Sequence, residues 1–102
     1  MSNEELNQIG SAILDSSITV HRELGPGLLE SAYELSLFHE LTLRGYKVQR
    51  QVPVPLKFKG FDLGKGYEID LLVEKEIIVE VKAALEMHPV YGINHYVSQI
   101  KQ

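Results

Sequence analysis

The chain has 102 residues and contains no cysteine, which excludes a disulfide framework and a thiolate metal site. No apolar run approaches the roughly 20 residues that span a bilayer, so we expect no membrane partner. The acidic N-terminal residues 1–5 lack the basic and apolar regions of a signal peptide. Together with the missing cysteines, these absences predict a cytoplasmic protein. The length of 102 residues predicts a single domain over residues 1–102.

A positive net charge is also lacking: the formal charge is −4, which gives no overall attraction to nucleic acid. Basic residues nevertheless concentrate between positions 44 and 65, where the single acidic residue is Asp62. The run consists of Arg44, Lys47, Arg50, Lys57, Lys59 and Lys65. Two interpretations stay open, a surface that meets phosphate groups and the commoner case of a solvated strand face.

Apolar periodicity predicts the order helix, helix, strand, strand, strand, helix, which is an α/β fold. A capping box of Ser2 and Glu5 should begin a helix over 3–23, which residues 25–27 end. A largely buried second helix is expected over 28–44. A strand with one buried face should follow over 46–59, and its two prolines place it at an edge or interrupt it. We expect a loop over 60–66, two strands within 67–82, and a last helix that begins at Pro89.

The two strands within 67–82 carry the most informative pattern, because a charged turn over 74–76 joins them. If this turn is symmetric about Lys75, one face gathers the apolar residues and the other places Asp70 opposite Glu80. The apolar face would consist of Tyr67, Ile69, Leu71, Val73, Ile77, Val79, Val81 and Ala83. A two-residue turn would shift the register by one and scatter this set, so the apolar pattern favours the symmetric turn.

Opposed carboxylates destabilise a sheet unless something lies between them. A divalent cation satisfies that condition, because Mg²⁺ is held by one or two carboxylates together with waters. Lys82 lies two residues after Glu80 and would point toward the same volume. A salt bridge from Lys82 to Asp70 or Glu80 explains the same pattern equally well. Glu30 is a further candidate, although the N-terminus of a helix favours a carboxylate on its own account.

The segment Gly27-Leu28-Leu29-Glu30-Ser31-Ala32-Tyr33 matches the signature G-x-x-E-x-x-Y, and residues 20–26, 52–54 and 70–74 fit its flanks. In these residues the chain resembles the GxxExxY family, which is placed in the PD-(D/E)xK nuclease superfamily. The resemblance implies that Asp70 and Glu80 are metal ligands assisted by the Val81 carbonyl. It also implies that Lys82 is the catalytic lysine and that Glu30 completes the catalytic set.

By resemblance, the fold would have a restriction-endonuclease-like core, with helices packed on a small mixed β-sheet. The activity would be Mg²⁺- or Mn²⁺-dependent hydrolysis of nucleic-acid phosphodiesters. The choice between DNA and RNA stays open, and DNA is the preferred expectation. The alternatives are a catalytically inactive module that binds nucleic acid or protein, and a metal site with a structural role only.

Two features depart from the family pattern. The family carries a glutamine on the helix after the Glu-x-Lys strand, and here Asn94, His95 or Gln99 lies near that place. A closing C-terminal strand is also missing, which would leave a sheet edge open to a second copy. A truncated product, an excerpt and a fold completed by a homodimer remain alternatives.

Overall fold

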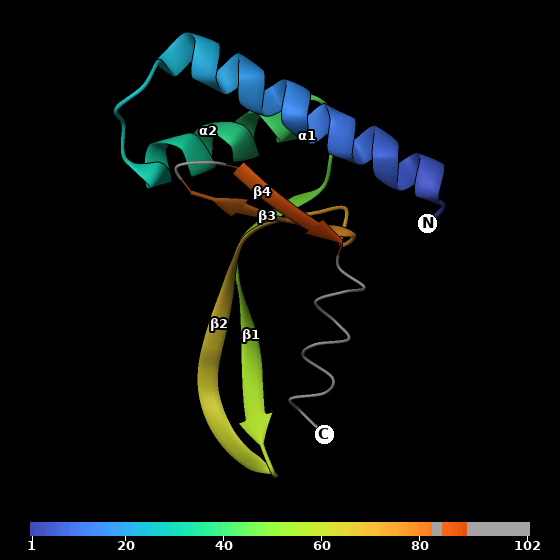
Figure 1. Cartoon of the computed structure of the whole chain (residues 1–102), viewed down its shortest axis with the longest axis vertical. Coiled ribbons are helices and arrows are strands. Elements are labelled where there is room, and N and C mark those ends of the chain that lie inside the picture. Colours follow the sequence, from blue (N-terminus) through green and yellow to red (C-terminus); the bar gives the residue numbers. More distant parts are fainter. Residues whose placement is uncertain (83–84, 90–102) are drawn as a thin grey trace.

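Two helices pack on a four-stranded antiparallel sheet in the computed structural model, which describes residues 1–82 and 85–89 (Figure 1). The elements are α1 (Asn3–Leu24), α2 (Glu30–Leu43), β1 (Val48–Phe58), β2 (Phe61–Val73), β3 (Ile77–Val81) and β4 (Leu85–Pro89). The predicted α/β class is therefore confirmed. No helix in the described part of the chain is long and apolar enough to cross a membrane.

The first helix begins and ends as the sequence predicts. The Ser2 hydroxyl accepts a hydrogen bond from the Glu5 N–H at 3.1 Å, and the Glu5 carboxylate accepts one from the Ser2 N–H at 3.3 Å. The Ser2 hydroxyl also donates to the Glu5 carboxylate at 3.0 Å, and this hydrogen bond, together with the one from the Ser2 N–H, lowers the pKa of Glu5 below its ordinary value of 4.5. Ile9, Ile13 and Val20 form the buried stripe of α1, and Gly25 ends the helix with a φ of 74°.

The second helix is buried on one face only, so the expectation of a largely buried helix over 28–44 is partly wrong. Leu37 and Leu41 join the core, whereas Leu35 and Leu43 are 48% and 69% exposed. The buried core brings this face of α2 together with one stripe of α1 and one face of β2 and β3. Its members are Ile9, Ile13, Leu37, Leu41, Leu71, Val73, Ile77, Val79 and Val81.

The register between β2 and β3 confirms the symmetric turn, because Leu71 pairs with Val79 and Val73 with Ile77. The strand order β1-β2-β3-β4 places β1 at an edge, as its two prolines predict. The predicted loop over 60–66 is wrong: β2 begins at Phe61, and a tight turn at Lys59 and Gly60 joins it to β1. Both turn residues have positive φ, which matches the twist of a hairpin.

The expected mixed sheet is also wrong, since every strand pairing among the described residues is antiparallel. The strand β4 (Leu85–Pro89) was not predicted, although its apolar and polar residues alternate along the sequence. Pro89 is the last residue of this strand, which lies at the edge of the sheet, and edge strands are where a sheet tolerates proline. The predicted last helix, with the place of the family glutamine and of any strand after it, lies outside the described residues.

Candidate functional site

The strands β2 and β3 part just where the two predicted metal ligands lie. Their last paired residues on this side are Leu71 and Val79, and Asp70 and Glu80 are the next residues along each strand. Asp70 is half-buried, and its Oδ2 accepts a hydrogen bond from the main-chain N–H of Val81 at 2.9 Å. The Asp70 carboxylate is therefore fixed against the backbone of the Glu80-Val81-Lys82 segment.

The second carboxylate has a partner that sequence reasoning missed. Tyr67 donates a hydrogen bond from its hydroxyl to Glu80 Oε1. Strict alternation predicted Tyr67 on the apolar face, away from Glu80, but alternation across two strands applies only while they remain paired. The strand β2 curves as it leaves the rest of the sheet (Figure 1), and its pairing with β3 ends at Leu71. The half-buried Tyr67 therefore reaches Glu80.

Three of the predicted site residues line one pocket of about 400 Å³, namely Glu30, Val81 and Lys82. The pocket lies between the end of α1, the loop that follows it, the first turns of α2 and the end of β3. Lys82 is exposed at the bend after β3, and Glu30 is exposed in the first turn of α2. Asp70 and Glu80 do not line this pocket, so the five predicted residues form two adjoining groups that share the Glu80-Val81-Lys82 segment.

The tyrosine of the G-x-x-E-x-x-Y segment holds the loop between the two helices. The Tyr33 hydroxyl donates to the Gly25 carbonyl at 2.6 Å and accepts from the Leu28 N–H at 3.2 Å. Its ring stacks on His21 with 5.0 Å between the centroids. The loop must turn through Gly25 and Gly27, both at positive φ, before α2 begins. Tyr33 thus fixes the backbone that leads directly into Glu30.

A buried carboxylate on α2 was also missed by the sequence analysis. Glu34 is 6% exposed, and it accepts hydrogen bonds from Arg50 Nη2 at 2.9 Å and from Gln51 Nε2 at 2.7 Å. Gln51 has a φ of 51°, and it lies between two residues of β1 that pair with Leu71 and Ile69. The cluster therefore ties α2 to β1 beside Asp70.

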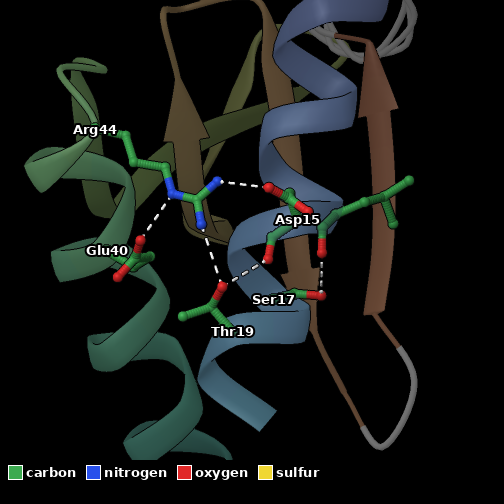
Figure 2. Close-up of polar contacts among 6 residues, drawn as sticks. Asp15, Ser17, Thr19, Glu40 and Arg44 are labelled. Atoms are coloured by element: carbon green, nitrogen blue, oxygen red, sulfur yellow. Dashed lines mark hydrogen bonds and ion pairs between the residues drawn. The ribbon is translucent and has the colours of Figure 1, made fainter. Parts of the chain in front are cut away.

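A second cluster of ion pairs and hydrogen bonds surrounds Arg44, as Figure 2 shows. Its guanidinium contacts Glu40 Oε2 at 2.7 Å, Asp15 Oδ2 at 3.1 Å and Thr19 Oγ1 at 3.2 Å. The hydrogen bonds to Glu40 and Asp15 raise the pKa of Arg44. Two cations of the basic run, Arg44 and Arg50, thus hold secondary-structure elements together instead of facing a partner.

The donor set beside β3 is compatible with a small divalent cation. Among the described residues, no group of three or more His, Cys, Asp or Glu side chains could hold a metal ion. Mg²⁺ needs only one or two carboxylates, since it keeps several waters. Asp70 and Glu80 supply two, and within the described residues each has one carboxylate oxygen that accepts no hydrogen bond.

Two helices on an antiparallel sheet thus place Asp70 at the divergence of two strands, beside the Glu80-Val81-Lys82 segment. The sequence profile of the PD-(D/E)XK nuclease superfamily matches residues 7–98, and the chain belongs to that superfamily. No curated protein and no solved structure gives a significant match.

Proposed function

We propose that this protein is a metal-dependent nuclease that hydrolyses phosphodiester bonds, with DNA as the preferred substrate. The observation that carries the proposal is the hydrogen bond from the Val81 N–H to Asp70. It joins the two separate parts of the superfamily's Asp…Glu-x-Lys pattern in a chain whose match to the superfamily covers residues 7–98. Membership alone does not establish turnover, because one fold carries many functions.

In the proposed site, Asp70 and Glu80 would hold Mg²⁺ or Mn²⁺ with the Val81 carbonyl. Such an ion, when bound, polarises a phosphoryl oxygen and lowers the pKa of bound water. Asp70 is oriented for this role by the Val81 N–H and Glu80 by the Tyr67 hydroxyl. Each donor binds only one oxygen of its carboxylate, so the other oxygen of Asp70 and of Glu80 would be available to the cation.

Lys82 would stabilise the charge that develops on the phosphoryl group or orient the attacking water. Its exposure at the bend after β3 supports this role, because a substrate phosphate can reach the ammonium group. Glu30 shares the pocket of Lys82 and would complete the acidic set. Its position depends on Tyr33, which holds the preceding loop.

The test is cleavage of supercoiled plasmid, linear duplex DNA, single-stranded DNA and RNA, each with Mg²⁺, Mn²⁺ or EDTA. We expect metal-dependent cleavage that Lys82→Ala, Asp70→Asn and Glu80→Gln each abolish. Lys75→Asn is the matched control, since Lys75 is an exposed lysine in the turn between β2 and β3. Cleavage that survives Lys82→Ala, or that persists in EDTA, would contradict the assignment.

A non-catalytic module that binds nucleic acid or protein is the second candidate. It is favoured by the hydrogen bonds that Asp70 and Glu80 already accept within the chain, which give each carboxylate a partner without a cation. On this account the protein binds nucleic acid equally well in EDTA and in Mg²⁺, and cleaves none of the four substrates. Calorimetric titration with Mg²⁺ separates the two candidates, because only the nuclease requires binding that Asp70→Asn weakens.

A further inference from the structure

The outer part of the β1–β2 hairpin forms a two-stranded ribbon that projects away from the helices (Figure 1). We call residues 52–69 the arm. In the described part of the chain, β2 pairs with β3 only over residues 71–73, so the arm has no third strand. Strand residues 52–58 extend roughly 20 Å at about 3.3 Å per residue. Of the arm residues whose exposure the structure describes, Ile69 at the base is the only buried one, so the outer arm does not fill the core.

The tip of the arm exposes large apolar side chains. Phe58 and Phe61 pair across the two strands and are 59% and 70% exposed, and Leu63 is 52% exposed. An isolated two-stranded hairpin buries little of its own surface, and exposed aromatic residues at its end gain nothing for folding. Their position points to contact with another molecule.

Lysines accompany these aromatic side chains. Lys57 lies next to Phe58, and the Lys59 ammonium lies 5.4 Å from the centre of the Phe58 ring. Neither lysine forms an ion pair within the described residues. The acid of the tip, Asp62, accepts a hydrogen bond from the Gly64 N–H at 2.7 Å. Arg44 and Arg50 are engaged in ion pairs, whereas Lys57 and Lys59 are available to an anionic partner.

We propose that the arm inserts into the major groove of duplex DNA, with Lys57 and Lys59 on phosphates and Phe58 and Phe61 against the base edges. This inference rests on the proposed function and adds the means by which the substrate is held. The major groove of B-DNA is about 12 Å wide and admits a two-stranded β-ribbon. The deep, narrow major groove of duplex RNA does not admit side chains in this way.

A second copy of the chain is a less suitable occupant. Pro53 and Pro55 lie in β1, which is the edge strand, and a proline has no N–H to offer to a strand of another molecule. Two arms that met at their tips would also bring four lysines together. The charge of the tip is opposite to that of a phosphate backbone and to the net charge of −4 on the whole chain.

The arm and the candidate site lie on one strand, which sets their separation. Phe61 precedes Asp70 by nine residues along β2, so the tip lies at most about 30 Å from Asp70. DNA rises about 3.4 Å per base pair, so this distance corresponds to roughly nine base pairs. The arm would therefore contact the duplex within about one helical turn of the phosphodiester bond that is hydrolysed.

The test uses binding of a fluorescein-labelled 30-base-pair DNA duplex, measured by anisotropy in EDTA over a series of salt concentrations. The variant is Lys57→Gln with Lys59→Asn. Lys59 and Gly60 have φ of 49° and 81°, and Asn-Gly is the preferred pair for such a turn, so the hairpin stays intact. Lys75→Asn is the matched control, because Lys75 is also a lysine in a hairpin turn, with a φ of 56°.

Loss of two phosphate contacts should reduce the magnitude of the negative slope of log K against log salt by about 1.8 and weaken binding roughly 30-fold at 0.15 M salt. Lys75→Asn should change neither quantity. Phe58→Thr with Phe61→Thr, which keeps strand propensity, should weaken binding and leave the slope unchanged. Duplex RNA of the same sequence should bind more weakly than the DNA.

Equal binding by the arm variants and Lys75→Asn would overturn the inference. So would sedimentation in which the phenylalanine variant converts a dimer into a monomer while DNA binding is unchanged, because the tip would then join two copies. Cleavage without arm-dependent binding refutes the arm and leaves the nuclease. Arm-dependent binding without cleavage refutes the nuclease and leaves the arm.

Discussion

The contact between Glu34 and Arg50 makes a prediction about how the site is held together. The Glu34 side chain is 8% exposed and that of Arg50 is 33% exposed, with 2.9 Å between Oε2 and Nη2. Gln51 donates a second hydrogen bond to the same carboxylate at 2.7 Å. Replacing Glu34 with alanine removes both acceptors and leaves the guanidinium of Arg50 beside the ring of Phe38 without its counter-ion.

The expected loss of stability can be worked out from these exposures. Removing one partner of a fully buried pair costs about 3–5 kcal/mol. Arg50 can turn its exposed third toward water, so we expect Glu34→Ala to lower the free energy of unfolding by about 2–3 kcal/mol. A hydrogen bond to a charged group contributes about 1.5–3 kcal/mol, so the coupling energy between Glu34 and Arg50 should be at least about 1.5 kcal/mol.

The assay is a double-mutant cycle of Glu34→Ala and Arg50→Ala, with urea unfolding followed by circular dichroism. The parallel cycle of Glu40→Ala and Arg44→Ala is the control, because it tests the same chemistry in an i,i+4 pair on the surface of α2. We expect the coupling energy of the Glu34 pair to be the larger. Equal coupling energies in the two cycles would refute the argument that burial of Glu34 gives the contact its strength.

Three further predictions concern single residues. Glu5→Gln should lower the melting temperature at pH 7, and this effect should become smaller as the pH falls below 4.5. The reason is that the hydrogen bonds that lower the pKa of Glu5 stabilise only its ionised carboxylate. Thermal melts at pH 7 and pH 3 test this prediction. Gly66→Ala would place a Cβ 2.7 Å from Leu56 Cγ, so urea unfolding should show a loss of about 1–2 kcal/mol, largely restored by a second change, Leu56→Ala. Tyr33→Phe should cost about 1 kcal/mol in the same assay and lower the cleavage rate with little change in DNA affinity, since it releases the loop before Glu30.

The sequence was informative wherever one strong local pattern decided the structure. The capping box placed the start of α1, and the apolar set on β2 and β3 placed the turn around Lys75. That register makes Asp70 and Glu80 the next residues along each strand after the pair of Leu71 and Val79. The prolines of β1 likewise predicted an edge strand. Each of these patterns is read within one element or between two adjacent strands.

Contacts between distant elements could not be read in the same way. The partner of Glu34 depends on Gln51, whose positive φ in the middle of a strand has no signature in a sequence that lacks glycine there. Tyr67 was assigned to the core because alternation assumes a straight, paired strand, whereas β2 leaves β3 after Leu71. The start of β2 at Phe61 was not predicted, because glycines at positions 60, 64 and 66 are typical of a loop.

The contacts of Glu34 with Arg50 and Gln51 explain why α2 has a buried carboxylate at this position instead of an apolar residue. Glu30 and Glu34 are one helical turn apart and therefore lie on the same side of α2. Glu30 lines the pocket of Lys82, and Glu34 binds Gln51, which lies beside Asp70 at the base of the arm. One helix turn thus connects both groups of the candidate site, and a shift of β1 relative to α2 would move Asp70 relative to Glu30. On this argument, Glu34→Ala should impair cleavage even at temperatures where the protein stays folded.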